Sequence, residues 1–91
     1  MSMIRSSVTI SNKLGLHARA SAKLTKLAGA YECDIHMSRN GRRVNAKSIM
    51  GVMMLAASQG STIVLETDGP DEAEAMQAIT QLIAGRFDED E

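Results

Sequence analysis

Apolar residues recur along this chain with two different periods, and the order of those periods restricts the possible folds more than any other feature. Apolar and polar positions alternate over 4–11 and 33–37, as they do in half-buried strands, and Ile63 and Leu65 mark a fourth strand. Over 20–31 and 75–83 the apolar positions recur at the spacing of an amphipathic helix. The predicted order is strand, helix, two strands, short helix, strand and helix.

Turn and cap residues separate these segments. Asn40-Gly41 favours a tight hairpin turn, Gly69-Pro70 leads into the last helix, and Gly85 can end that helix. The alternation within the strands implies that one face of the sheet is covered. We therefore expect an α+β protein with a four-stranded antiparallel sheet and three helices on one face, including a short helix after Ser48.

The composition fits one small domain over residues 1–91. With 44% hydrophobic residues and only Tyr31 and Phe87 as aromatics, the core must consist mainly of aliphatic side chains, methionine and alanine. Cys33 is the single cysteine, and no run is long enough for a membrane span or a signal peptide, so we expect a cytoplasmic protein. We expect the acidic tail, 87–91, to be solvated and frayed.

The charges are distributed unevenly between the two halves of the chain. Residues 1–47 contain nine lysines and arginines against two acids, whereas 48–91 contain one against nine, which gives the net charge of −1. A basic N-terminal half favours phosphate or partners with acidic surfaces. Nucleic acid is a poor alternative, because the two aromatic residues lie outside the basic segments and no nucleic-acid motif is present.

His17 follows a strand-like segment and opens a helix-like one, so it should lie at a helix N-terminus. The first N–H groups of a helix have no partners within it, and a phosphoryl group on this imidazole would meet them. Arg19 adds a guanidinium whose shape matches phosphate oxygens. A neutral imidazole can accept a phosphoryl group and release it again. Its position alone also fits an ordinary capping or surface histidine.

Two segments resemble known functional segments of one family. Lys13-Leu-Gly-Leu-His17-Ala-Arg19 resembles the phosphorylation-site segment of HPr, the histidine phosphocarrier of the bacterial phosphotransferase system. The segment 44–55, which contains Ser48, resembles the regulatory-serine segment of that family and lies at the family's interval from the histidine. The similarity covers nearly the whole chain and implies the open-faced sandwich of HPr. Ala20 stands where the family commonly has proline, so the first helical turn loses a residue that would stiffen it.

The resemblance implies a stoichiometric phosphoryl carrier and not an enzyme, with no cofactor. His17 Nδ1 would accept the phosphoryl group from phosphohistidine of enzyme I and pass it to an enzyme IIA domain. Arg19 would stabilise the transferred charge, together with the backbone amides of Ala18 and Arg19. Ser48 would be a regulatory site for a dedicated serine kinase and phosphorylase, although an N-cap role alone would explain a serine there.

The segment 49–57 is apolar around its whole circumference, so a small domain must leave part of it exposed. Exposed methionines suit a surface that meets several partners, while plain core filling is the alternative for each of them. We expect a monomer whose partner contacts are Leu16, Lys23, Lys26, Ile49, Met50 and Met53.

Other readings of the sequence stay open or are disfavoured. A regulatory phosphocarrier of the nitrogen branch, or a protein-binding module that carries no phosphate, would fit the same fold. A metal site built from His17, His36 and Cys33 lacks any recognisable ligand spacing. A hydrolase is disfavoured because the chain has neither a nucleophile-elbow motif nor a glycine-rich phosphate loop.

Overall fold

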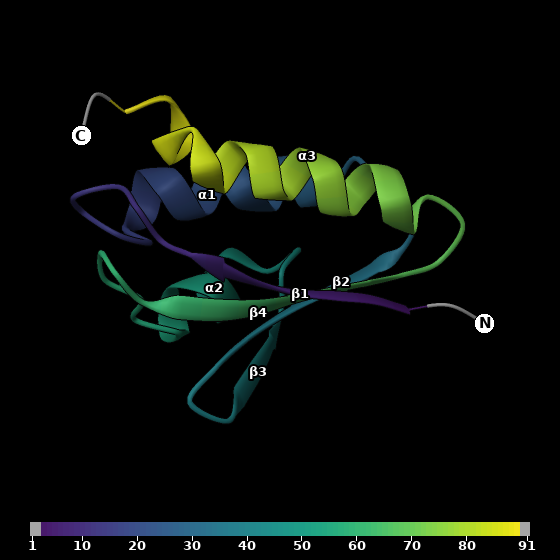
Figure 1. The fold of residues 1–91 in the computed structure, drawn as a ribbon, viewed down its shortest axis with the longest axis horizontal. Coiled ribbons are helices and arrows are strands. Elements are labelled where there is room, and N and C mark those ends of the chain that lie inside the picture. Colours follow the sequence, from purple (N-terminus) through teal and green to yellow (C-terminus); the bar gives the residue numbers. More distant parts are fainter. Residues whose placement is uncertain (1–2, 90–91) are drawn as a thin grey trace.

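The computed structural model describes residues 3–89. They form, in order, β1 (Met3–Thr9), α1 (Ala18–Ala28), β2 (Asp34–Arg39), β3 (Arg42–Asn45), α2 (Ile49–Met54), β4 (Thr62–Asp68), α3 (Glu72–Ala84) and the 3-10 turn η1 (Arg86–Asp88). The predicted order of elements is confirmed. The four strands form one antiparallel sheet in the order β1-β4-β2-β3. Figure 1 shows α1 and α3 side by side over one face of this sheet.

The last strand of the chain, β4, lies in the interior of the sheet between β1 and β2. Ile63, Leu65 and Thr67 on the helix-covered face of β4 are fully buried. The Thr67 hydroxyl donates a hydrogen bond of 2.9 Å to the carbonyl of Glu72, which ties β4 to the start of α3. The period-two pattern therefore predicted the covered face, whereas the strand order comes from contacts between distant parts of the chain.

The hairpin between β2 and β3 has the predicted turn. Asn40 and Gly41 adopt positive φ angles of 51° and 82°, as a two-residue turn of type I′ requires. Arg39 and Arg42 are the first paired residues on its two sides. The turn thus sets the register that places Met37 on the buried face and Ser38 on the open one.

Two amphipathic helices cover the sheet and form one core with it. The 11 residues of α1 and the 13 residues of α3 each bury one stripe, and α2 adds Val52. No helix within residues 3–89 is both long and apolar enough to cross a membrane. The buried apolar residues are Ile10, Leu16, Ala20, Leu24, Ala28, Cys33, Ile35, Met37, Ala46, Val52, Leu55, Ala57, Ile63, Leu65, Ala75, Ile79, Ile83 and Phe87.

The expectation of a frayed tail over 87–91 is wrong for residues 87–89, while residues 90 and 91 lie outside the described residues. Phe87 is fully buried in the core. Arg86, Phe87 and Asp88 all adopt left-handed φ angles, of 58°, 55° and 63°. Burying a phenylalanine stabilises a fold by about 1.5–3 kcal/mol, which offsets part of the cost of three left-handed residues. The aromatic side chain therefore anchors the tail despite its acidic sequence.

Candidate functional site

The loop between β1 and α1 positions His17, and several hydrogen bonds hold its backbone. The Leu16 amide donates to the carbonyl of Ala57 at 2.8 Å, which joins this loop to the segment after α2. Gly15 has a φ of 66°, and a Cβ at this position would overlap the Ala57 carbonyl oxygen. Only glycine therefore allows the two backbones to approach so closely. The side-chain amide of Asn12 adds a hydrogen bond of 2.8 Å to the Gly15 carbonyl.

His17 lies at the N-cap of α1, as predicted. Its backbone is extended (φ −73°, ψ 178°), and the first helical hydrogen bond runs from the Ser21 amide to the His17 carbonyl at 2.9 Å. The amides of Ala18 and Arg19 thus precede the hydrogen-bond ladder of the helix, where they can donate to an anion. The His17 side chain is 27% exposed, so a partner can reach its ring. Arg19 lies exposed in the same first turn.

The carboxylate of Glu89 occupies one side of the His17 ring. Its Oε2 atom lies 2.5 Å from His17 Nε2, and its Oε1 atom accepts a 3.0 Å hydrogen bond from Asn12 Nδ2. Partial burial opposes the ionisation of Glu89, but the hydrogen bonds from Asn12 and His17 outweigh it and lower the pKa of its carboxyl group. Neither Asn12 nor Glu89 was predicted from the sequence, because nothing local in the sequence links residues 72 positions apart.

The basic residues of α1 differ in their surroundings. Lys23 is half-buried, and its ammonium donates a 2.7 Å hydrogen bond to the carbonyl of Phe87. Lys26 is exposed. Both lysines border a shallow cavity of about 450 Å³ between α1 and the end of the chain, which is also lined by Leu27, Ala30, Leu82 and Asp88. Lys23 therefore has a structural role in addition to its predicted contact with partners.

Five exposed apolar side chains, here called the apolar patch, are Leu14 of the loop before α1 and Ile49, Met50, Met53 and Met54 of α2. Leu14 and Met50 are each 68% exposed. α2 packs against α1, and the Leu16 amide donates a hydrogen bond to the carbonyl of Ala57, shortly after α2. The apolar patch therefore lies near His17. Leu14 was not among the predicted surface residues, because a single apolar loop residue has no periodic signal.

The prediction that Leu16 contacts partners is wrong in this structure. Its side chain is only 5% exposed and belongs to the core. The bond between the Leu16 amide and Ala57 draws the residue inward, and Ser21 Oγ holds the Leu16 carbonyl at 3.1 Å. Leu16 therefore supports the loop of His17 from behind, whereas Ile49, Met50 and Met53 are exposed as expected.

Ser48 is the N-cap of α2, as the sequence predicted. Its Oγ atom accepts a 3.1 Å hydrogen bond from the Gly51 amide, and the residue itself is exposed. The neighbouring residues Ile49 and Met50 belong to the apolar patch. A charge added to the Ser48 hydroxyl would therefore stand at the edge of that patch.

The cysteine and the second histidine do not join the site. Cys33 is buried beside Asp71, the N-cap of α3, and this burial, with a hydrogen bond to the Asp71 carboxylate, raises the pKa of its thiol to about 11. Its thiol is therefore protonated at neutral pH and is a poor nucleophile. His36 lies on the sheet, opposite Glu66 of β4. Within residues 3–89 no three histidine, cysteine or acidic side chains gather as metal ligands would.

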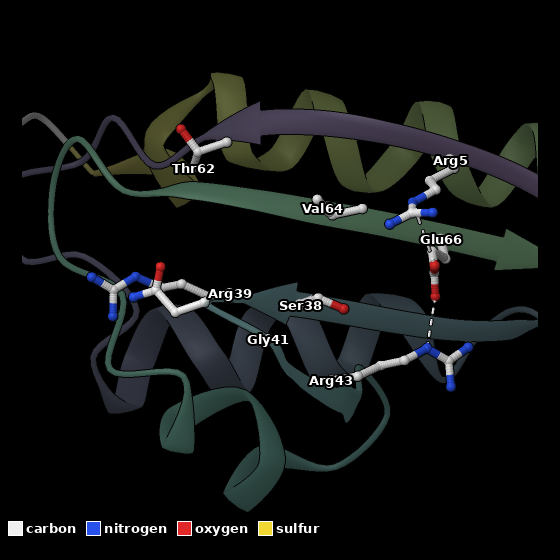
Figure 2. A pocket seen from close by; sticks show the side chains of 9 residues that line it. Arg5, Ser38, Arg39, Gly41, Arg43, Thr62, Val64 and Glu66 are labelled. Atoms are coloured by element: carbon white, nitrogen blue, oxygen red, sulfur yellow. Dashed lines mark hydrogen bonds and ion pairs between the residues drawn. The ribbon is translucent and has the colours of Figure 1, made fainter.

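The open face of the sheet carries a second cavity, of about 360 Å³. Figure 2 shows that Glu66 points out between Arg5 and Arg43, with Ser38 and Val64 beside it. Glu66 is 8% exposed, and its two oxygens lie 2.8 Å from Arg43 Nε and 3.6 Å from Arg5 Nε. The single negative charge of Glu66 is thus shared between Arg5 and Arg43.

The start of α1 suits the transient binding of a phosphoryl group. It combines the accessible His17 ring, two backbone amides that make no hydrogen bond within the helix, and the exposed guanidinium of Arg19. The His17 ring is partly exposed, and α2, which carries most of the apolar patch, packs against α1. An open-faced α+β sandwich with such a site belongs to the class of small proteins that carry a phosphoryl group between larger partners.

Comparisons with known proteins agree with this class. Residues 4–85 match the family model described as the PTS HPr component phosphorylation site. The phosphocarrier protein HPr of Cupriavidus necator is 68% identical over 89 residues, which cover 98% of this chain and all of that protein. HPr of Neisseria meningitidis is 57% identical with the same coverage. The chain therefore belongs to the HPr family, the phosphocarriers of the phosphotransferase system.

Solved structures of relatives share the whole fold. A crystal structure of HPr-C-His from Thermoanaerobacter tengcongensis covers all of both chains with a TM-score of 0.92 and 40% identity. HPr from Bacillus anthracis is 40% identical and has a TM-score of 0.88 over 91% of this chain and 99% of its own. An HPr dimer from Thermoanaerobacter tengcongensis, 43% identical, has a TM-score of 0.78 over 90% of this chain and 94% of its own.

Proposed function

We propose that His17 is the residue that carries the phosphoryl group, through its Nδ1 atom. The observation that carries this proposal is the N-cap position of a half-buried but reachable imidazole, directly before two amides that precede the helical ladder. The phosphoryl group would come from a phosphohistidine of enzyme I and pass to a histidine of an enzyme IIA domain. The protein acts as a stoichiometric carrier in this scheme and not as an enzyme.

The experiment that tests this assignment is incubation with phosphoenolpyruvate and enzyme I, followed by intact-protein mass spectrometry. We expect one added phosphoryl group that is labile in acid and stable in base, as a phosphoramidate is. Peptide mapping should place it on His17. A phosphoryl group that survives acid treatment, or that maps to Ser48 or His36, would contradict the assignment.

A carrier must hold its phosphoryl group only moderately, so that the group can leave again. Arg19 and the amides of Ala18 and Arg19 would donate hydrogen bonds to its oxygens at the exposed start of α1. Tighter binding in a closed pocket would oppose transfer to the next protein. The exposed guanidinium of Arg19 can follow the moving charge, because the described residues do not hold it in an ion pair.

Arg19→Ala is expected to slow phosphoryl transfer to an enzyme IIA domain about 10- to 100-fold while leaving the melting temperature unchanged. The side chain is exposed and contributes little packing, but it can stabilise developing phosphoryl charge. Stopped-flow or quench-flow transfer rates measure the effect. Arg19→Lys is the matched control, because it keeps the charge but loses the planar fork and should retain part of the rate. A parental rate in Arg19→Ala would exclude Arg19 from the mechanism.

We further propose that enzyme I and enzyme IIA domains bind the protein as a monomer at the apolar patch, next to His17. Lys26 would add charge complementarity to acidic partner surfaces. Lys23 would do the same when its ammonium leaves the Phe87 carbonyl and contacts a partner instead. The free, buried thiol of Cys33 suits the reducing cytoplasm, where we place these encounters. Transfer assays with alternative enzyme IIA proteins distinguish a sugar-uptake acceptor from a nitrogen-branch acceptor.

Ser48 is the proposed regulatory site, and a serine kinase is its proposed partner. Phosphorylation would add close to two negative charges at the edge of the apolar patch while the N-terminus of α2 still accommodates the group. The expected consequence is weaker docking without loss of the fold.

Ser48→Asp is accordingly expected to weaken binding to enzyme I about 10-fold without lowering the melting temperature. Aspartate is a good N-cap, but it places a charge beside Ile49 and Met50. Titration calorimetry against enzyme I measures the affinity. Ser48→Asn is the matched control, because asparagine also caps a helix but adds no charge, and it should bind like the parent. Equal affinities of both variants would mean that Ser48 acts only as a cap.

A further inference from the structure

We infer that Glu89 is a positioning residue, which holds the His17 ring in the tautomer with its proton on Nε2 and thereby leaves the Nδ1 lone pair for phosphorus. This inference rests on the proposed role of His17 as the phosphoryl carrier. Glu89 belongs to the acidic segment 87–91, for which the sequence pattern indicates no role beyond a solvated end.

The contact between the two side chains determines which nitrogen carries the proton. Glu89 Oε2 lies 2.5 Å from His17 Nε2, which is within hydrogen-bond distance. An ionised carboxylate has acceptors only, so Nε2 must be the donor. A neutral imidazole has a single N–H, and when Nε2 carries it, Nδ1 holds a free lone pair.

One hydrogen bond to the carboxylate and two contacts of the preceding Phe87 hold Glu89 in this place. Asn12 is fully buried, and its Nδ2 atom donates both to Glu89 Oε1 at 3.0 Å and to the Gly15 carbonyl at 2.8 Å. Phe87 anchors the chain in the core two residues earlier. The ammonium of Lys23 holds the carbonyl of Phe87 at 2.7 Å. The Glu89 side chain is accordingly only 16% exposed, which is unusual for an acid near a chain end.

The backbone that leads to Glu89 is itself unusual. Three consecutive residues other than glycine, Arg86 to Asp88, have positive φ angles. Such conformations cost free energy and persist only where the surroundings impose them. Here the left-handed turn brings Glu89 to the first turn of α1, so the strained segment ends at the His17 ring.

The same carboxylate can stabilise the charge that appears during transfer. The Nδ1 lone pair forms the new N–P bond while the bond between phosphorus and the donor nitrogen breaks, and that bond's electron pair returns to the donor ring. The proton on Nε2 stays in place, so the His17 ring acquires positive charge. Glu89 accepts the hydrogen bond from this proton and offsets the charge. Onward transfer reverses these changes, since the N–P electron pair returns to Nδ1.

The test compares the ring tautomer and the transfer rate in Glu89→Gln. Nitrogen-15 NMR of the unphosphorylated protein, at a pH where the ring is neutral, reports which nitrogen carries the proton. In the parent we expect the proton on Nε2. The glutamine amide can either donate or accept, so the share of the Nδ1-protonated form should rise at least threefold, and phosphoryl uptake from enzyme I should slow about 10-fold.

Glu74→Gln is the control, because Glu74 is an exposed acid in the first turn of α3 and its replacement causes the same change in net charge. This variant should keep the parental tautomer and rate. A parental proton on Nδ1, a tautomer ratio unchanged by Glu89→Gln, or an unchanged uptake rate would overturn the inference. Failure of the parent to be phosphorylated on His17 would instead contradict the proposed carrier site, because the tautomer measurement requires no phosphoryl transfer.

Discussion

The His17→Ala protein is expected to take up no phosphoryl group from enzyme I, with a loss of at least about 1000-fold in rate, while its fold is kept. The imidazole supplies the accepting nitrogen, and no other described side chain near the start of α1 can replace it. The ring is partly exposed and lies outside the core, so its removal should change the melting temperature little. Intact-protein mass spectrometry and thermal unfolding measure the two properties.

His36→Ala is the matched control for this experiment. His36 lies on the sheet, opposite Glu66, and outside the first turn of α1. The variant should therefore be phosphorylated at the parental rate. If His17→Ala still gained an acid-labile phosphoryl group, or if His36→Ala lost it, the accepting nitrogen would have to be sought elsewhere.

Phe87→Ala is expected to lower the free energy of unfolding by about 3–5 kcal/mol, because it leaves a cavity where a fully buried aromatic ring packs. The loss is large for a domain of this size, in which the total stability is only about 5–15 kcal/mol. The variant should also release Glu89 from His17, because Phe87 anchors the left-handed turn that directly precedes Glu89. Urea unfolding followed by circular dichroism measures the stability.

Phe87→Leu is the matched control, because it replaces the aromatic ring but still fills most of the buried space. Leucine keeps most of the buried volume, so this variant should lose less than about 2 kcal/mol and keep the tail in place. A loss below about 1 kcal/mol for Phe87→Ala would show that the end of the chain is not part of the core in solution.

The helix-facing side of the sheet, both principal helices and the tight turn could all be predicted from local sequence. Met37 and Leu65 have their buried positions because alternation in a strand dictates the face. The turn at Asn40-Gly41 and the cap at Ser48 follow from the conformations that these side chains favour. His17 could be placed at its helix for the same reason, since the change of hydrophobic period occurs there.

The exceptions all involve partners that are distant in sequence. Glu66 occupies a polar position of β4 and is nevertheless shielded, because Arg5 and Arg43 from the neighbouring parts of the sheet pair with it. Leu16 was expected on the surface, but the hydrogen bond of its amide to Ala57 carries it into the core. No periodic pattern in either segment contains this information.

Local sequence was enough to predict which residues form strands and helices and that a histidine begins one of the helices, because both depend on periodicity and on residues a few positions apart. The position of β4 between β1 and β2, and the contact of Glu89 with the His17 ring across 72 residues of chain, depend instead on packing between distant segments. These arrangements arise when the core closes: burial of Phe87 stabilises an unfavourable backbone turn, and that turn completes the site.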